Sequence, residues 1–314
     1  MTSPIQTKAD EQSIAACPGR DVGLGVRDHL SERPYGRCAQ MVPDPIPPSE
    51  KIYRHTWPVR LGHWLNAVCL FILIGSGLQI FNAHPALYWG DRSDRDKALL
   101  SIRPMRSSGG EIRGITTVLG RQFDTTGVLG YSNGAGRAFP AWATIPSPRW
   151  LAMGRQWHLF FAWVFVLNGL IFAAYGLGSR HFKKDLLPTG LDLKDISRAV
   201  KDHLLLRHPK GEQAKRYNVL QKLAYLAVIF LLAPLIVLTG LAMSPTIDAA
   251  FPWLLSLFGG RQAARTIHFL ACFSFVGFIV VHLLQVILTG LFNNLRSMIT
   301  GYFAVKHEGV SHEA

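Results

Sequence analysis

The sequence predicts an all-α integral membrane protein, a four-transmembrane-helix bundle with a long loop between its first two spans. Three observations lead to this fold class. Of the 314 residues, 49% are hydrophobic and only 17% are charged. The apolar residues fall into four long blocks, and a block of about 20 apolar residues spans a hydrocarbon core of ~30 Å. The basic residues gather between these blocks, where membrane topology uses them.

The elements follow one another in a simple order. A polar, proline-bearing segment over 1–50 is expected to be a flexible cytoplasmic tail. The membrane domain is expected over 51–302, and a second cytoplasmic tail over 303–314. Pro234 is expected to kink the third span, because proline cannot donate the helical hydrogen bond. The four spans are expected at about 61–81, 156–177, 223–243 and 263–290.

The connections between the spans predict the orientation in the membrane. The segment 178–222 is short and holds eleven basic residues against five acidic ones, so it belongs in the cytoplasm together with both termini. The segments 82–153 and 244–262 then face the other side, which makes 82–153 a long periplasmic loop. Short strands or a hairpin could lie in this loop, and its length is more typical of a cap or a docking segment than of a tether. A floppy insertion is the alternative.

Charge and cysteine content exclude several classes of protein. The net charge of +13 first suggests nucleic acid, but the basic residues form no stripe with interleaved aromatic residues, so no nucleic-acid partner is expected. The four cysteines show no C-x-x-C, C-x-x-C-H or zinc spacing. Covalent c-type haem, iron–sulfur clusters and a disulfide framework are therefore unsupported. The chain is instead expected to be surrounded by the lipid bilayer.

Four of the twelve histidines lie within the predicted spans: His63, His158, His268 and His282. An ionisable side chain inside a membrane is costly and usually marks function. Because the spans alternate in direction, His63 and His282 are expected at cytoplasmic depth, and His158 and His268 at periplasmic depth. The histidines of span four are 14 residues apart, which returns them to within about 40° of one face after a rise of about 21 Å. Two histidine pairs are thus expected inside one bundle.

Bis-histidine haem iron fits this pattern best, because each iron takes one nitrogen ligand on each axial side. Two haem b groups are predicted, with His63 and His282 as the inner ligand pair and His158 and His268 as the outer pair. Zinc would be left with half of its tetrahedral shell empty, and a proton relay would include acidic residues, which the spans lack. Each macrocycle would also need small residues where it passes close to the backbone, and basic residues near its anionic propionates. Candidates are Gly75, Gly77, Gly169 and Gly277, and for the propionates Arg60, Arg155, Arg261 and Arg265, which could equally be interfacial anchors.

Several stretches resemble the bacterial di-haem b-type cytochromes of the cytochrome b-561-like superfamily, which supplies membrane subunits to Ni/Fe-hydrogenases, formate dehydrogenases and thiosulfate reductases. They are "YRHTWPVRLGHWLNA", "RQWHLFFAW", "YNVLQKLAY" with "LTGLAMSP", and "ARTIHFL" through "VHLLQVILTG". Together they cover about 51–90 and 150–302. The segments "NAHPALYWG" and "GGRQAARTIHF" most resemble those of the thiosulfate reductase cytochrome b branch. Proteins of that branch are often paired with a periplasmic molybdopterin oxidoreductase.

The resemblance implies that the four span histidines are the axial ligands and that a quinone site lies beside the inner haem. In the formate dehydrogenase relatives an N-x-G-Q-K stretch before the third helix contributes to that site. Here Asn218, Gln221 and Lys222 match this stretch, while Leu220 occupies the glycine position. A helix N-cap is the alternative role for Asn218.

The expected function is that of a membrane-anchoring electron-transfer subunit in the bacterial inner membrane. It would pass electrons between the quinone pool and a periplasmic redox partner, expected to be a molybdopterin oxidoreductase. No catalytic residue is predicted, because the chemistry belongs to the haem. A self-sufficient transmembrane haem reductase stays open as an alternative. A proton or metal transporter is a further one, although it would call for intramembrane acidic residues or broken helices in paired halves.

Overall fold

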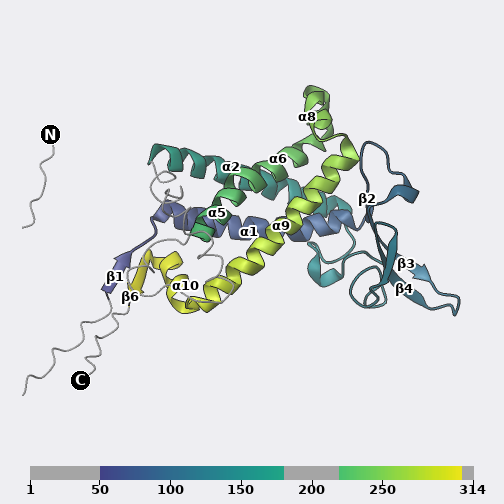
Figure 1. The fold of residues 1–314 in the computed structure, drawn as a ribbon, viewed down its shortest axis with the longest axis horizontal. Helices are drawn as coiled ribbons and strands as arrows, with labels where there is room; N and C mark the ends of the chain where they lie inside the picture. Colours follow the sequence, from purple (N-terminus) through teal and green to yellow (C-terminus); the bar gives the residue numbers. More distant parts are fainter. Residues whose placement is uncertain (1–49, 180–218, 306–314) are drawn as a thin grey trace, which may run out of the picture. The chain divides into compact units, whose positions relative to one another are not determined.

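The computed structural model describes residues 50–179 and 219–305, which all belong to one of the two units of the chain, 46–314. Four helices in it are long and apolar enough to cross a membrane, which confirms the predicted four-span class (Figure 1). Many of their large apolar side chains are exposed, for example Phe71 and Ile171, as expected for surfaces that lipid covers. The spans are α1 (Trp57–Phe81), α2 (Leu151–Gly178), the run of α5 (Val219–Ala227), η5 (Val228–Leu232) and α6 (Ala233–Ala242), and α9 (Arg261–Leu288).

The third span contains a widened helical turn. Residues 228–232 form a π-helical turn, and Pro234 follows directly at the start of α6. Proline cannot donate a backbone hydrogen bond, and its ring crowds the carbonyl four residues earlier, which here belongs to Phe230. A π turn adds room at such a position. The span therefore stays continuous across the proline.

The first two spans are joined inside the membrane by a buried amide. Asn168 of α2 is only 8% exposed, and its Nδ2 donates to Gly62 O (3.0 Å) and to Asn66 Oδ1 (2.8 Å), both on α1. Such interhelical hydrogen bonds, together with close packing, hold membrane helices together in the absence of a hydrophobic drive.

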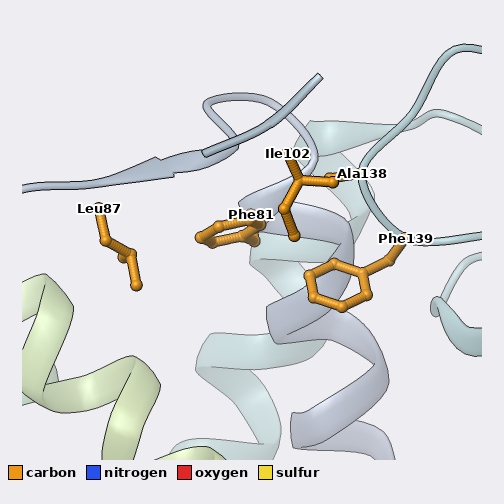
Figure 2. Packing of buried hydrophobic residues seen from close by; sticks show 5 residues of the cluster. All are labelled: Phe81, Leu87, Ile102, Ala138 and Phe139. Carbon is orange, nitrogen blue, oxygen red and sulfur yellow. The ribbon is translucent and has the colours of Figure 1, made fainter. Parts of the chain in front are cut away.

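The long loop after α1 folds into a four-stranded antiparallel sheet at one end of the helices (Figure 1). Gly114 is pressed against the backbone at Leu129, where a Cβ would not fit. Phe81 at the end of α1, Leu87, Ile102, Ala138 and Phe139 form the apolar core that joins this sheet to the bundle (Figure 2). The elements are β2 (Ala86–Leu87), η1 (Arg95–Lys97), β3 (Leu100–Arg106), β4 (Ile112–Val118), β5 (Arg121–Asp124) and η2 (Ala141–Ala143), with strand order β2-β3-β4-β5.

The return segment, residues 137–148, lies along the C-terminal end of α1. Arg137 is 6% exposed and donates to Gln79 Oε1 (3.0 Å), to the hydroxyl of Thr144 (2.8 Å) and to a backbone carbonyl. Burial, and to a lesser extent the neighbouring Arg149, lower the pKa of Arg137 from its ordinary value. Ile145 N donates to Gly75 O at 3.0 Å, and the Ile145 side chain occupies the space above that glycine. The segment that follows the sheet β2–β5 is thereby packed against α1.

The loop also caps the beginning of α9. The backbone N–H groups of Gln262 and Ala263 donate to Gly90 O at 2.9 and 3.0 Å, and Arg261 N donates to Asp91 Oδ1 at 3.3 Å. A helix leaves its first four N–H groups without intrahelical partners, and these contacts satisfy three of them. The start of α9 is therefore held in place by residues about 170 positions earlier in the chain. Two short helices, α7 (Pro245–Ala250) and α8 (Pro252–Leu257), fill most of the connection that precedes it.

The opposite end of the bundle is closed by elements that the sequence did not predict. Helix α10 (Leu291–Thr300) follows α9, and strand β6 (Tyr302–Val305) pairs antiparallel with β1 (Glu50–Tyr53). Trp64 Nε1 donates to Met298 O at 3.1 Å, and Arg60 donates to Ile299 O. Helix α10 therefore packs against the beginning of α1.

Candidate functional site

The structure brings the four span histidines together in the two pairs expected from depth. His63 of α1 faces His282 of α9, with ring centroids 6.2 Å apart and ring planes at 56°. His158 of α2 faces His268 of α9, with centroids 6.2 Å apart and planes at 61°. Each pair thus joins α9 to a different helix, and α9 carries one histidine of each pair.

The separation within each pair matches that of two ligands on opposite sides of one metal ion. A histidine nitrogen lies about 2.0 Å from a bound first-row metal and roughly 1.1 Å from its own ring centre, so trans imidazoles have centroids about 6.2 Å apart. Within residues 50–179 and 219–305, no group of three or more His, Cys, Asp or Glu side chains could hold a metal. Two protein ligands per site fit a macrocycle that supplies the other donors, and they do not fit zinc.

The outer pair is held by hydroxyl groups on the neighbouring helices. Ser76 Oγ on α1 lies 3.0 Å from His158 Nδ1. Thr239 Oγ1 on α6 lies 3.1 Å from His268 Nδ1. Both hydroxyl-bearing residues are fully buried, at 0% exposure.

A glycine follows each of these hydroxyl residues and leaves room for the imidazole. A Cβ built on Gly77 would lie 3.4 Å from His158 Cε1, and one on Gly240 would lie 3.3 Å from His268 Cε1. Gly77 therefore has the place expected of a small residue beside the site. Of the other three glycines, Gly75 is covered by Ile145, and a Cβ on Gly169 or Gly277 would have no protein atom within 4 Å.

The inner pair has different surroundings. His63 Nδ1 is buried and has no hydrogen-bond partner among the described residues. The ring of Phe278 stacks on His282, with centroids 5.8 Å apart and planes at 15°. Tyr225 of α5 in turn contacts Phe278 at 6.5 Å. Aromatic side chains thus connect the inner pair to the third span.

Phe275 lies on α9 between its two histidines and is 2% exposed. It contacts Phe165 of α2 edge-to-face at 6.5 Å. Cys69 of α1 is also fully buried. Phe275 and Phe165 thus provide an apolar contact between the two histidines of α9, and a porphyrin face requires apolar surroundings.

The four candidate arginines differ in what they already bind. Arg261 forms an ion pair with Asp248 at 2.8 Å, so its charge is compensated. Arg155 is exposed on the first turns of α2. Arg265 donates to His84 O and lies over the Phe81 ring at 5.6 Å, while Arg60 keeps a buried Nε without a partner. Neither Arg60 nor Arg265 has a carboxylate partner within the described part of the chain, which leaves these two as the better counter-ions for propionates.

Of the two expected quinone residues, Asn218 lies outside the described residues. Gln221 is half-buried in α5, one turn before Tyr225. Ser76, Thr239, Gly240 and the Tyr225–Phe278 contact were not predicted. The only signal for the first three was a hydroxyl residue followed by glycine in two different spans, and such pairs are also ordinary in membrane helix packing.

Comparisons with known proteins identify similar sequences. The family model described as prokaryotic cytochrome b561 matches residues 54–301. A protein from Azospira oryzae that carries the name protein-methionine-sulfoxide reductase subunit YedZ1 is 34% identical over 158 residues, which cover 49% of this chain and 73% of that protein. No solved structure gives a significant match.

Proposed function

Because the chain belongs to the prokaryotic cytochrome b561 family and is a membrane haem b electron-transfer subunit, we propose that it binds two haem b groups. In this proposal it passes electrons between the quinone pool and a periplasmic redox partner. His63 and His282 hold the inner haem, and His158 and His268 hold the outer one. Each bound haem supplies a one-electron iron couple, and the protein supplies ligation, orientation and electrostatics.

The observation that carries this proposal is the pairing of four imidazoles at two levels. In both pairs the ring centroids are 6.2 Å apart, so the two imidazoles of each pair could hold one haem iron between them. Their α9 members are 14 residues apart, a rise of about 21 Å along a helix, so the two sites together extend across most of a bilayer core. Arg60 and Arg265, whose charges have no described carboxylate partner, neutralise propionates at the inner and the outer level.

The proposed quinone site lies where α5 approaches the inner pair. Tyr225 contacts Phe278, which stacks on His282, and Gln221 lies one turn from Tyr225 along the same helix face. An amide and a phenol at this place suit the two carbonyl oxygens of a quinone. Asn218 is proposed to contribute as well, on the strength of the family resemblance alone.

The proposed periplasmic partner docks on the outer sheet, β2–β5, and on the neighbouring helices α7 and α8. This orientation in the bacterial inner membrane rests on the basic cytoplasmic connection. Support for a partner comes from the relative, whose name describes a subunit of a reductase. The thiosulfate reductase resemblance points to a molybdopterin oxidoreductase as the kind of partner.

A haem count on the purified protein tests the proposal. The pyridine haemochrome assay should give two haems b per chain. His63→Ala and His282→Ala should each remove the same spectral component, and His158→Ala and His268→Ala should each remove the other. His84→Ala is the matched control, because this exposed histidine of the outer loop belongs to neither pair, and it should keep both haems. A colourless protein, or losses that pair the histidines differently, would contradict the proposal.

A further inference from the structure

Both histidines of the outer pair contact a hydroxyl oxygen, and the protons of these contacts can be assigned. Ser76 Oγ lies 2.7 Å from Ile72 O as well as 3.0 Å from His158 Nδ1. A carbonyl oxygen can only accept, so the single hydroxyl proton of Ser76 goes to Ile72 O. The hydroxyl oxygen is then left to accept the hydrogen bond from His158 Nδ1, for which the Leu73 carbonyl is a second acceptor. His158 is therefore the tautomer with hydrogen on Nδ1, and its Nε2 keeps a lone pair for a metal.

The same assignment of protons applies to His268, the second histidine of this pair. Thr239 Oγ1 lies 2.7 Å from Leu235 O and 3.1 Å from His268 Nδ1. Its proton goes to the carbonyl, and its oxygen accepts from His268 Nδ1. Helices α1 and α6 are far apart in the sequence and thus contain the same arrangement. In each, a hydroxyl group donates to a carbonyl of its own helix, and the next residue is glycine.

Within residues 50–179 and 219–305, no such hydroxyl contact is found at His63 of the inner pair. His63 Nδ1 is buried, and none of the described residues accepts its hydrogen bond. The two sites therefore differ in how their ligands are held, although the ring separation is the same. An acceptor for the outer nitrogen of a ligating histidine fixes the ring orientation and makes the ligand a stronger electron donor. Stronger donation stabilises the oxidised metal and lowers the reduction potential.

The structure assigns to Ser76 and Thr239 the role of positioning residues that orient the outer ligand pair and lower the potential of the outer site. This role rests on the proposed function, since it presumes that His158 and His268 bind a haem. Ser76 and Thr239 would touch neither the haem nor a substrate in this role, and they act only through the two imidazoles.

Thr239→Val removes the hydroxyl and keeps the shape of the side chain, whereas Thr239→Ser keeps the hydroxyl and removes a methyl group. Potentiometric titration of the visible haem bands should show an upward shift of the outer component in Thr239→Val and none in Thr239→Ser. The inner component should stay in place in both. The outer component is identified as the one missing from His268→Ala. The EPR signal of the oxidised outer haem, which depends on ligand orientation, should also change only in Thr239→Val.

Ser76→Ala should shift the same component in the same direction. Its matched control is Ser274→Ala, because Ser274 Oγ donates to Leu270 O at 2.9 Å in the same way but is exposed and forms no hydrogen bond with a histidine of the described residues. This control should leave both potentials unchanged.

Each outcome decides the role of the hydroxyls. An unchanged outer potential in Thr239→Val, or an equal shift in Thr239→Ser, would overturn the assignment. If Thr239→Val loses the outer haem, retention by Thr239→Ser supports the role of the hydroxyl, and loss by both overturns it. If wild-type protein lacks a component that His268→Ala removes, the proposed function fails instead.

Discussion

Replacing Gly75 by alanine tests whether Ile145 of the return segment packs closely against α1. A Cβ at this position would lie 2.7 Å from Ile145 Cγ1 and 2.9 Å from Ile145 Cδ1. Ordinary van der Waals contact begins at 3.4 Å, so the two segments must separate by 0.7 Å or the isoleucine must leave its position. Overpacking of this kind costs about 1–3 kcal/mol. The hydrogen bond from Ile145 N to Gly75 O is expected to weaken at the same time.

A double-mutant cycle measured by thermal unfolding in detergent checks this prediction. Gly75→Ala should lower the unfolding temperature, and Ile145→Ala should lower it separately by removing apolar contact. The double variant should be more stable than the sum of the two effects predicts, by about 1 kcal/mol, because the overlap is gone. Gly169→Ala is the control: a Cβ there meets open space, and alanine favours helix. Strict additivity in the cycle would refute the seating of Ile145 on Gly75.

Three further predictions concern charge, helix packing and pH. Arg265→Gln should lower the potential of the outer haem by roughly 40–80 mV, which is about 1–2 kcal/mol for one electron, whereas the exposed Arg155→Gln should have a smaller effect in the same titration. Asn168→Ala removes two hydrogen bonds between α1 and α2 and should lower stability in detergent by about 1–2 kcal/mol. Partial desolvation of the mostly exposed ring, followed by the charges of Arg265 and two other arginines, lowers the pKa of His84 from its ordinary value of 6.5. Protonation of His84 therefore favours unfolding, so stability should fall as the pH drops below 6.5 towards the folded-state pKa, and His84→Gln should make unfolding temperatures less dependent on pH over that window.

The histidine pairs could be predicted from the sequence because helix geometry is regular. A fixed rise and a fixed rotation per residue place His268 and His282 on one face of one helix. The alternation of spans across the bilayer then gives each of them a partner at its own depth. No knowledge of side-chain contacts is needed for that step, and the structure brings the expected residues together.

The hydroxyl contacts of the outer pair could not be predicted in this way. Whether Ser76 meets His158 depends on how α1 and α2 are rotated about their axes, and the sequence of neither helix contains that angle. Arg137 illustrates the same limit, because its partner Gln79 belongs to the preceding helix, 58 positions earlier in the chain. Arg261 was one of four candidate partners for a propionate, and its ion pair with Asp248 of α7 could not be foreseen from the sequence.

By itself, the sequence determined the number of spans, the side of the membrane expected for each connection and the levels at which imidazoles occur. These follow from the length of apolar blocks, the distribution of basic residues and the helical repeat, which can all be measured within one stretch of chain. Only the tertiary structure decided how the helices are rotated, how the outer sheet is joined to them and which partners each ligand histidine has. The cap of α9 shows the reason: Gly90 and Asp91 meet residues 261–263 across about 170 positions, and such a contact exists only once the chain has folded.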